Sequence, residues 1–419
     1  MTTGIRRGRW AIAIALALTL AACSNGATED TGSTTTTAAA ETTAAGETTT
    51  TTASTDTTAG SGEPIILGVS YPLSGGAAAL GESAMRGAEL YLNAVNDAGG
   101  IDGRPIELLV QDNACTPADG VTAMSALVDA ATKPVAILGA FCSSSTIAAL
   151  PVIERGEIPL LVDAAAAPII TESGNPWVFR WGGSDAVFAR VMASYLVNET
   201  DIRRVALVGD NTDYGSGGIE AAKAAIANHP ELEIVSEDLV DLNSPDFTPM
   251  WRRIGASEPD AVWLHSVAVA GTLTLLDQYG QTNLANIPIV GRPNNDGATL
   301  EIFEQYGLNG YSAFHYAAEV DSTRNAEFIA EWEAAYGSTD GAAIGYFGYQ
   351  GAEVAVTALR EADSIDPEGI RAALENMSLS PTLLGGSIEF NEKNQASNHV
   401  VLFQFNGSTL DVVFVGSAD

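Results

Sequence analysis

A run of small polar side chains, Cys142-Ser143-Ser144-Ser145-Thr146, is the part of this sequence with the clearest chemical potential. It follows the apolar stretch 135–138, which predicts a strand. Four kinds of site use such residues: a nucleophilic serine, a phosphate loop, a serine that caps its own helix, and a cradle for a ligand anion. Each kind makes different demands on the neighbouring residues.

The sequence lacks what the first two kinds of site need. A nucleophile elbow places glycines around its serine, whereas Phe141 and Cys142 precede Ser143 and no glycine follows it. No phosphate-loop motif, dinucleotide fingerprint or metalloprotease motif occurs. The four histidines belong to no catalytic signature; they are His229, His265, His315 and His399. We therefore expect no enzymatic turnover, no cofactor and no metal ion.

The two remaining kinds of site share one geometry. We expect a helix to begin near Ile147, with the three serines at its N-terminus. There a hydroxyl can cap the helix, or hydroxyls and free backbone N–H groups can hold a ligand carboxylate. The position after a strand favours the ligand, because parallel α/β sheets bind ligands at their carboxyl edges. The cap stays open as the alternative.

The elements that position this cluster alternate along the chain. Apolar strands are predicted at 64–71, 105–113, 134–141 and 203–211, and a helix at 82–100 with Gly99-Gly100 as its stop. Apolar strands separated by helices imply parallel sheets that are covered on both faces. About 355 residues follow the N-terminal region, which favours two α/β lobes. The final stretch, 385–415, alternates and predicts antiparallel strands.

The N-terminal region has two parts that precede the globular chain. Residues 1–22 carry arginines and then a short apolar run, which predicts a cleaved export signal. The run ends in Leu20-Ala21-Ala22-Cys23, similar to a bacterial lipoprotein signal, so we expect Cys23 to be lipidated and to anchor the chain to a membrane. Residues 23–62 are mostly Thr, Ala, Ser, Gly and acidic residues, which predicts a disordered tether.

Composition restricts the partners. The chain has 52 acidic against 19 basic residues and a formal net charge of −33, which argues against nucleic-acid binding. Besides Cys23, the cysteines are Cys115 and Cys142. An even pair in an exported protein predicts a disulfide, with two buried free thiols as the alternative.

Several stretches of the sequence resemble one known family. The export signal, the tether, "CSSST" and the segments 71–121, 158–168 and 213–217 are similar to the periplasmic leucine/isoleucine/valine-binding proteins of ABC transporters. The resemblance is strongest between residues 65 and 180. It implies the type I periplasmic-binding-protein fold, with two Rossmann-like α/β lobes joined by hinge crossovers and closing on a ligand. It also supports the Cys115–Cys142 disulfide.

The resemblance also assigns site residues. The family's carboxylate site falls on Ser143, with Ser144 beside it, and on backbone groups near Ala164 and Ala166. The tyrosine that closes from the second lobe falls on Tyr214. An aromatic lining falls on Tyr346 or Tyr349, between which the spacing does not decide.

Three positions depart from the family's pattern. Ala166 stands where amino-acid binders have a threonine, Leu80 replaces a tyrosine, and Pro293 or Asn294 replaces the glutamate that holds the ligand ammonium. A buried ammonium without a carboxylate is costly.

Two readings of these departures remain. Either Asp296 or Asp163 supplies the counter-charge, or the ligand is an amide or another carboxylate rather than an α-amino acid.

The function implied is a lipid-anchored, extracytoplasmic binding protein that delivers a small solute to an ABC transporter permease. A receptor of the same fold that signals to a separate membrane partner is the alternative. We expect lobe 1 to comprise 63–182 and 316–383, and lobe 2 to comprise 183–315 and 384–419. The hinges are expected near 180–182, His315-Tyr316 and Leu383–Ser387.

Overall fold

Two large sheets, one parallel and one mixed, organise the computed structural model, which describes residues 62–267, 269–293 and 297–416. The first sheet has the strand order β2-β1-β3-β4-β5, and all its pairs are parallel. Its strands are β1 (Ile65–Tyr71), β2 (Ile106–Asp112), β3 (Ala136–Gly139), β4 (Leu160–Val162) and β5 (Val178–Arg180). We call this sheet and the helices that pack on it lobe 1.

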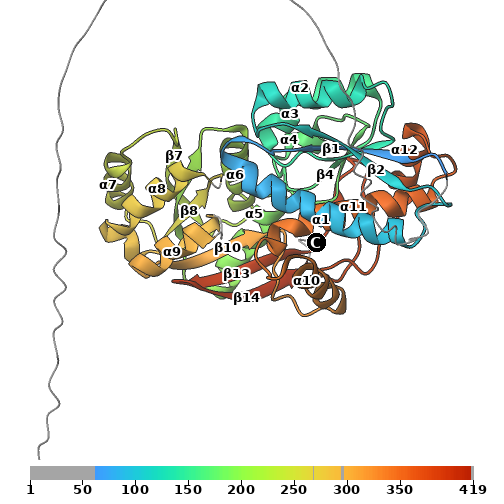
Figure 1. Ribbon diagram of the computed structural model, residues 1–419. Coiled ribbons are helices and arrows are strands. Elements are labelled where there is room, and N and C mark those ends of the chain that lie inside the picture. The colour runs from blue at the N-terminus through green and yellow to red at the C-terminus, as the bar shows by residue number, and fades with distance from the viewer. Residues whose placement is uncertain (1–61, 268, 294–296, 417–419) are drawn as a thin grey trace, which may run out of the picture. The chain divides into compact units, whose positions relative to one another are not determined.

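Helices cover both faces of the lobe 1 sheet. On one face α1 lies alongside α11, and on the other α2 lies alongside α3 (Figure 1). The helical segments are η1 (Gly75–Ala77), α1 (Ala78–Asp97), α2 (Pro117–Val128), α3 (Ser143–Gly156), α4 (Ile169–Glu172), α10 (Thr323–Tyr336), α11 (Ala342–Glu361) and α12 (Pro367–Asn376). A short antiparallel pair, β11 (Glu389–Phe390) and β12 (Ala396–Ser397), completes the lobe.

The second sheet is mixed and defines lobe 2. Its order is β14-β13-β10-β9-β8-β6-β7, with the last two strands of the chain antiparallel at one edge. The strands are β6 (Arg204–Asp210), β7 (Glu233–Val240), β8 (Ala261–His265), β9 (Ile289–Arg292), β10 (Asn309–Phe314), β13 (Val400–Asn406) and β14 (Thr409–Gly416). The antiparallel pair confirms the pattern predicted for 385–415.

Lobe 2 is also covered on both faces. Its helical segments are α5 (Asp185–Glu199), α6 (Asp213–Ile226), α7 (Thr248–Ala256), α8 (Ala270–Gly280), η2 (Asn283–Asn286) and α9 (Gly297–Tyr306). One core lies between the sheet and α5 and α6, and a second lies under α7 and α8. The central strands β6 and β8 are therefore buried along nearly their whole length, and their polar residues lie at the strand ends.

The predicted helix over 82–100 is confirmed as α1. Two glycines explain how closely α1 packs against α11. A Cβ at Gly87 would lie 1.9 Å from the carbonyl oxygen of Gly345, and one at Gly348 would lie 1.7 Å from that of Ala84. The two helix backbones approach too closely for any side chain at these positions. The predicted stop is also confirmed, since Gly99 and Gly100 both have positive φ.

Three segments carry the chain between the lobes and contact one another. Residues 181–184 lead from β5 to α5, residues 315–322 lead from β10 to α10, and Asn398-His399 lead from β12 to β13. The backbone N–H of Gly183 donates to Nδ1 of His315 at 3.0 Å, and the Asn398 amide donates to the Trp181 carbonyl at 3.2 Å. These bonds tie the three crossovers into one hinge region.

The third crossover differs from the position expected at Leu383–Ser387. Gly385 and Gly386 both have positive φ, so the chain turns back there, and Leu379 bridges Ile388. Further along the chain, Gln395 forms a parallel bridge with Arg180, the last residue of β5. Segment 384–397 therefore contacts lobe 1, and the chain reaches the second sheet only at Val400. The full set of domain boundaries stays a prediction.

Some expectations lie outside the described residues. These are the export signal (1–22), the lipidated Cys23, the tether up to residue 61, and Asp296. Within the residues that the structure does describe, no helix combines the length and the hydropathy needed to span a bilayer.

Candidate functional site

The serine cluster forms the first turn of α3, four residues earlier than the start expected near Ile147. Cys142 is the N-cap in an extended conformation, and no side chain caps this helix. The hydroxyls of Ser145 and Thr146 donate back to the Cys142 carbonyl at 2.9 and 2.7 Å. The Ser143 hydroxyl instead accepts a hydrogen bond from the backbone N–H of Ala167 at 3.3 Å. The reading of the cluster as a plain side-chain cap is therefore not what the structure shows.

A disulfide holds the start of α3. Cys142 is bonded to Cys115, with a Cα–Cα distance of 5.4 Å. Cys115 lies in the loop between β2 and α2, where its N–H donates to the Asn113 side chain. The predicted pairing is present, and it links the serine cluster to the carboxyl edge of β2. The N-terminus of α3 is thereby fixed relative to the sheet.

The loop after β4 faces this helix terminus. Arg180 is buried and donates to the carbonyls of Ala165 and Ala167 at 3.3 and 2.7 Å, which holds the loop in place. The Ala166 side chain is fully buried, and its carbonyl accepts from the backbone N–H of Asp185 at 2.9 Å. The N–H of Ala164 donates to its neighbour Asp163. The family resemblance assigns backbone groups near Ala164 and Ala166 to the carboxylate site. The Ala164 N–H and the Ala166 carbonyl therefore both have protein partners.

Asp163 is the buried acid of lobe 1. It is 1% exposed, and its Oδ2 has no hydrogen-bond partner. Burial raises the pKa of Asp163 to about 6, while the Ala164 N–H and the Tyr71 hydroxyl act in the opposite direction. The same burial raises the pKa of Tyr71 well above its ordinary value. Lobe 1 thus places an uncompensated carboxyl at the carboxyl edge of its sheet.

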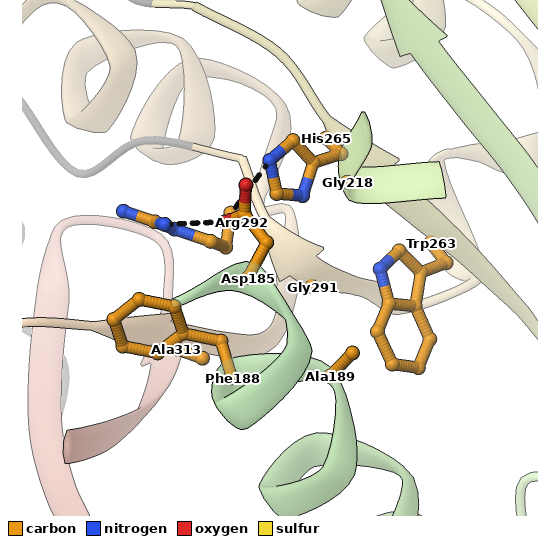
Figure 2. A pocket seen from close by; sticks show the side chains of 9 residues that line it. All are labelled: Asp185, Phe188, Ala189, Gly218, Trp263, His265, Gly291, Arg292 and Ala313. Carbon is orange, nitrogen blue, oxygen red and sulfur yellow. Dashed lines mark hydrogen bonds and ion pairs between the residues drawn. The ribbon is translucent and has the colours of Figure 1, made fainter. Parts of the chain in front are cut away.

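Lobe 2 brings an ion pair to the facing edge. Asp185 begins α5 and Arg292 ends β9, and the Arg292 guanidinium donates to Asp185 Oδ1 at 2.7 Å. His265, at the end of β8, has its Nε2 3.4 Å from the same oxygen. Figure 2 shows Asp185 between the two partners. All three side chains are at most 6% exposed.

The charges of this cluster determine its protonation. Burial by itself would raise the pKa of Asp185, but His265 and Arg292 outweigh it and hold that pKa below its ordinary value. Burial and the charge of Arg292 hold the pKa of the nearby His315 well below its ordinary value. Asp185 is therefore ionised and His315 uncharged at neutral pH.

Aromatic rings surround the Arg292 guanidinium. Its central carbon lies 4.3 Å from the ring centroid of Phe188 and 5.6 Å from those of Tyr214 and Phe314. The ring of Tyr214 also lies 4.4 Å from that of His265. Tyr214, which the sequence assigned to the site, is thereby placed against the charged cluster. These ring contacts favour a fixed guanidinium position.

A small cavity adjoins the cluster. Its volume is about 10 Å³, and it lies between α5, α6 and the sheet of lobe 2 (Figure 2). The lining residues are Asp185, Phe188, Ala189, Gly218, Trp263, His265, Gly291, Arg292 and Ala313. The lining is apolar apart from the ion pair and its histidine. At this volume the cavity has room for about one water-sized group and not for a whole solute.

Two residues of the loop after β4, Ala166 and Ala167, link the serine cluster of lobe 1 to the charged cluster of lobe 2. The Ala167 N–H is bonded to Ser143 of lobe 1, and the Ala166 carbonyl is bonded to the Asp185 N–H at the start of α5. A Cβ at Gly217, in α6, would also lie 3.7 Å from the Ala167 side chain. The serine cluster and the charged cluster are therefore neighbours.

Other assigned residues lie elsewhere. Tyr346 is 1% exposed and stacks on Tyr316 with 4.5 Å between ring centroids, inside the lobe 1 core. Tyr349 donates to Glu331 between α10 and α11. Two rings of α11 contact the crossovers. Phe347 lies 5.0 Å from His315, and Tyr346 lies 5.6 Å from Trp181 and accepts a hydrogen bond from the Asn398 amide. Ser144 lies in the first turn of α3 and is half-buried.

The sequence reasoning missed the residues of the charged cluster. Asp185, His265 and Arg292 come from three separated segments, and each directly ends a strand or begins a helix. That position at an element boundary was the available signal. Within the described residues, no group of His, Cys, Asp and Glu side chains could hold a metal ion.

Comparison with known proteins agrees with this architecture. Residues 64–409 match the periplasmic binding protein family. An amino acid binding protein of Pseudomonas aeruginosa is 34% identical over 48% of this chain and 53% of its own length. The Leu/Ile/Val-binding protein BraC3 of Rhizobium johnstonii is 28% identical over 77% of this chain and 86% of its own. The chain thus spans about half of the first relative and most of the second.

Solved structures share the fold. The leucine binding protein LivK of Thermotoga maritima has a TM-score of 0.75 and 21% identity, covering 84% of this chain and 98% of that one. A solute binding protein of an R. palustris ABC transporter, in complex with benzoate, has a TM-score of 0.73 and 22% identity. That match covers 85% of this chain and 96% of the other. At this identity the likeness concerns the fold.

Proposed function

The chain belongs to the periplasmic binding protein family, and from that premise we propose that it captures a small carboxylate-bearing solute and delivers it to an ABC transporter permease. The family consists of extracytoplasmic solute-binding proteins and not of enzymes. Its members of known structure share the type I fold described above. Function then rests on binding and lobe closure rather than on chemistry.

One observation carries the proposal. Ser143 begins α3, is 3% exposed, and turns its hydroxyl toward the loop after β4 instead of capping its own helix. A carboxylate placed there would meet this hydroxyl and the free N–H groups of the first helical turn, with the helix dipole in its favour. Ser144 in the same turn and Tyr214 from lobe 2 complete the proposed site, together with backbone groups at Ala164 and Ala166. The Ala164 N–H and the Ala166 carbonyl are bonded to Asp163 and Asp185 and would exchange these partners for the ligand.

Several observations bear on the chemical class of the solute. The names of the relatives support a branched-chain amino acid. The benzoate complex supports a carboxylate without an ammonium group. Where amino-acid binders have their glutamate, this chain has Pro293 or Asn294, and the acid Asp185 is already paired with Arg292. Besides branched-chain amino acids we therefore include carboxylates that lack an ammonium group among the proposed solutes, and we keep uncharged amides as the alternative class.

We propose further that the protein is held at a membrane. The sequence of the signal and Cys23 supports a lipid anchor, and the threonine-rich stretch supports a tether between the anchor and the lobes. Metabolic labelling with a radioactive fatty acid, compared between the protein and a Cys23→Ala variant, tests this part. Label that persists in the variant would contradict the anchor.

The first experiment is a ligand screen by thermal unfolding of the purified protein. Leucine, isoleucine, their deaminated acids, benzoate and short amides are compared at equal concentrations. A ligand at 100 times its Kd stabilises the native state by about 2.7 kcal/mol, which gives a clear rise in Tm. A set in which only uncharged amides stabilise the protein would contradict carboxylate capture.

The best ligand of that screen is then titrated into two serine variants. Ser143→Ala should weaken binding by about 1.5–3 kcal/mol, because a hydrogen bond to a charged group is lost. Ser145→Ala is the matched control, since that hydroxyl donates within its own helix. Equal losses of affinity in both variants, or a loss of stability alone in Ser143→Ala, would favour a structural role for Ser143.

A further inference from the structure

Three buried atoms of the charged cluster in lobe 2 have no hydrogen-bond partner. One of them, His265 Nε2, still lies 3.4 Å from Asp185 Oδ1, which leaves two atoms to explain. Asp185 uses Oδ1 for Arg292 and His265, while its Oδ2 is buried without a hydrogen bond. Arg292 uses one terminal nitrogen for Asp185, while its Nε is buried without a hydrogen bond. Buried polar groups are almost always satisfied, so such a pair needs an explanation. One atom is an acceptor and the other is a donor.

The pair lies next to the proposed carboxylate site. Asp185 is bonded through its backbone to Ala166, and Ser143 is bonded to the adjacent Ala167. A ligand whose carboxylate occupies the N-terminus of α3 therefore has its neighbouring atoms close to the ion pair. Asp185 and Arg292 also line the cavity, together with Phe188 and Trp263. The partner of the two unsatisfied atoms can thus come from the ligand itself.

Charge excludes two kinds of ligand group at this position. The charge of Asp185 is compensated by Arg292 at 2.7 Å, so a ligand ammonium would be repelled by the guanidinium about as strongly as it is attracted by the carboxylate. A second ligand carboxylate would be repelled by Asp185 in the same way. Either ion would lose its hydration without a net counter-charge, which is unfavourable in a buried site.

A neutral group that both donates and accepts fits the two atoms. A hydroxyl can donate to Asp185 Oδ2 and accept from Arg292 Nε, and a carboxamide can do the same with its NH₂ and its carbonyl. We infer that lobe 2 recognises a neutral hydroxyl or carboxamide on the bound carboxylate, and that this solute is not an α-amino acid in its ammonium form. The inference rests on the proposed function, whose carboxylate site supplies the other end of the ligand.

The test compares matched ligands that differ in one group. One set is leucine, 2-hydroxy-4-methylpentanoate and 4-methylpentanoate, with ammonium, hydroxyl and hydrogen at the same carbon. The second set is 4-(aminomethyl)benzoate, 4-hydroxybenzoate and benzoate. Kd values are measured by calorimetry at pH 7 with the full chain. In whichever set binds, we expect the hydroxyl member to bind at least about tenfold more tightly than both others.

A double variant tests whether Asp185 and Arg292 cause the preference for the hydroxyl ligand. Asp185→Asn with Arg292→Gln removes both charges together, which avoids leaving one buried ion alone. The hydroxyl preference should fall to within about threefold in this variant. Asp129→Asn with Arg155→Gln is the control, because that ion pair is exposed on lobe 1 and far from the cluster in the fold. The control should keep the full preference.

The outcomes separate the inference from its premise. Tighter binding of the ammonium members, or a hydroxyl preference that persists in the folded double variant, overturns the inference and leaves carboxylate capture intact. If all six carboxylates fail to bind while short uncharged amides do bind, carboxylate capture is overturned and the inference falls with it. If the double variant does not fold, the ligand comparison in the unmodified protein still decides.

Discussion

Each lobe buries a carboxylate near the facing sheet edges, Asp163 in lobe 1 and Asp185 in lobe 2, and these two behave in opposite ways. Asp163 of lobe 1 has no cation beside it, and burial raises its pKa to about 6. Asp185 of lobe 2 is equally buried, but Arg292 and His265 hold its pKa below the ordinary value. Burial alone thus favours the neutral acid, and only an adjacent cation reverses that preference.

The contrast extends to how each lobe can recognise a ligand. Lobe 1 presents uncharged donors, a hydroxyl and backbone N–H groups, at the N-terminus of α3. Lobe 2 presents an ion pair whose net charge is zero. The first arrangement suits an anion of almost any shape, since backbone groups surround it. The second is directional, because a side-chain donor and acceptor fix where a ligand group must lie.

The largest expected effect comes from removing the cation of lobe 2. Arg292→Met leaves Asp185 buried without a partner, which should lower the free energy of unfolding by about 3–5 kcal/mol. Urea unfolding at pH 7, monitored by circular dichroism, measures this change. Arg155→Met is the control, because its pair with Asp129 is exposed on both sides and should leave the midpoint nearly unchanged. Equal midpoints for both variants would remove the distinction between the lobes.

The next effect is the pH dependence that Asp163 should produce. Below about pH 4 this carboxyl is protonated in both states; between about pH 4 and 6 only the native state keeps the proton. The unfolding free energy therefore falls as pH rises through this window, by about 3 kcal/mol in total. Asp163→Asn should abolish that fall and be the more stable protein at pH 7. An unchanged pH profile in the variant would contradict the raised pKa.

Asp185 should show the opposite sign. Its lowered pKa adds stability that is fully present above the pKa of the unfolded state and is lost as pH falls below about 4. Stability curves of the Asp163→Asn variant measured down to pH 2 should display this loss, together with the losses from exposed carboxyls whose pKa is also lowered. Adding Asp185→Asn should remove the Asp185 part of that loss. A further fall in stability between pH 4 and 6 would show that another group titrates there.

Removing the disulfide tests how firmly lobe 1 holds its helix terminus. The bridge joins residues 27 positions apart, so Cys115→Ala with Cys142→Ala should cost about 3 kcal/mol in the chain-entropy model. Ligand affinity should fall as well, since the start of α3 loses its link to the edge of β2. A reducing agent should weaken the unmodified protein and leave the double variant unaffected. A variant with unchanged affinity would show that the bridge serves stability alone.

The smallest expected effect concerns Tyr214. Tyr214→Ala removes a ring that contacts His265 and the Arg292 guanidinium, so affinity for the best ligand of the screen should fall by about 1 kcal/mol. Tyr195→Ala is a matched control, because that half-buried ring of lobe 2 contacts Tyr311, with 5.1 Å between ring centroids, and not the charged cluster. Calorimetric titration distinguishes the two. Equal affinities would remove Tyr214 from the site.

Local patterns in the sequence determined most of the architecture. Apolar runs separated by amphipathic helices predict parallel sheets, and α1 with its glycine stop follows directly from residue periodicity. The serine cluster also follows from its place after a strand. The pairing of Cys115 with Cys142 needed only the count of cysteines and an exported chain. These features depend on neighbours in sequence, so the sequence displays them.

Long-range contacts decided the rest. Asp185, His265 and Arg292 are separated by 80 and 27 positions, and only the register of β8 and β9 beside α5 brings them together. The contacts of the α11 aromatics depended on helix rotation, which placed Phe347 beside His315 and Tyr346 against Tyr316. Sequence spacing shows which residues can lie at a sheet edge. Which of them meet, and hence which charges compensate one another, is determined by the packing of whole elements.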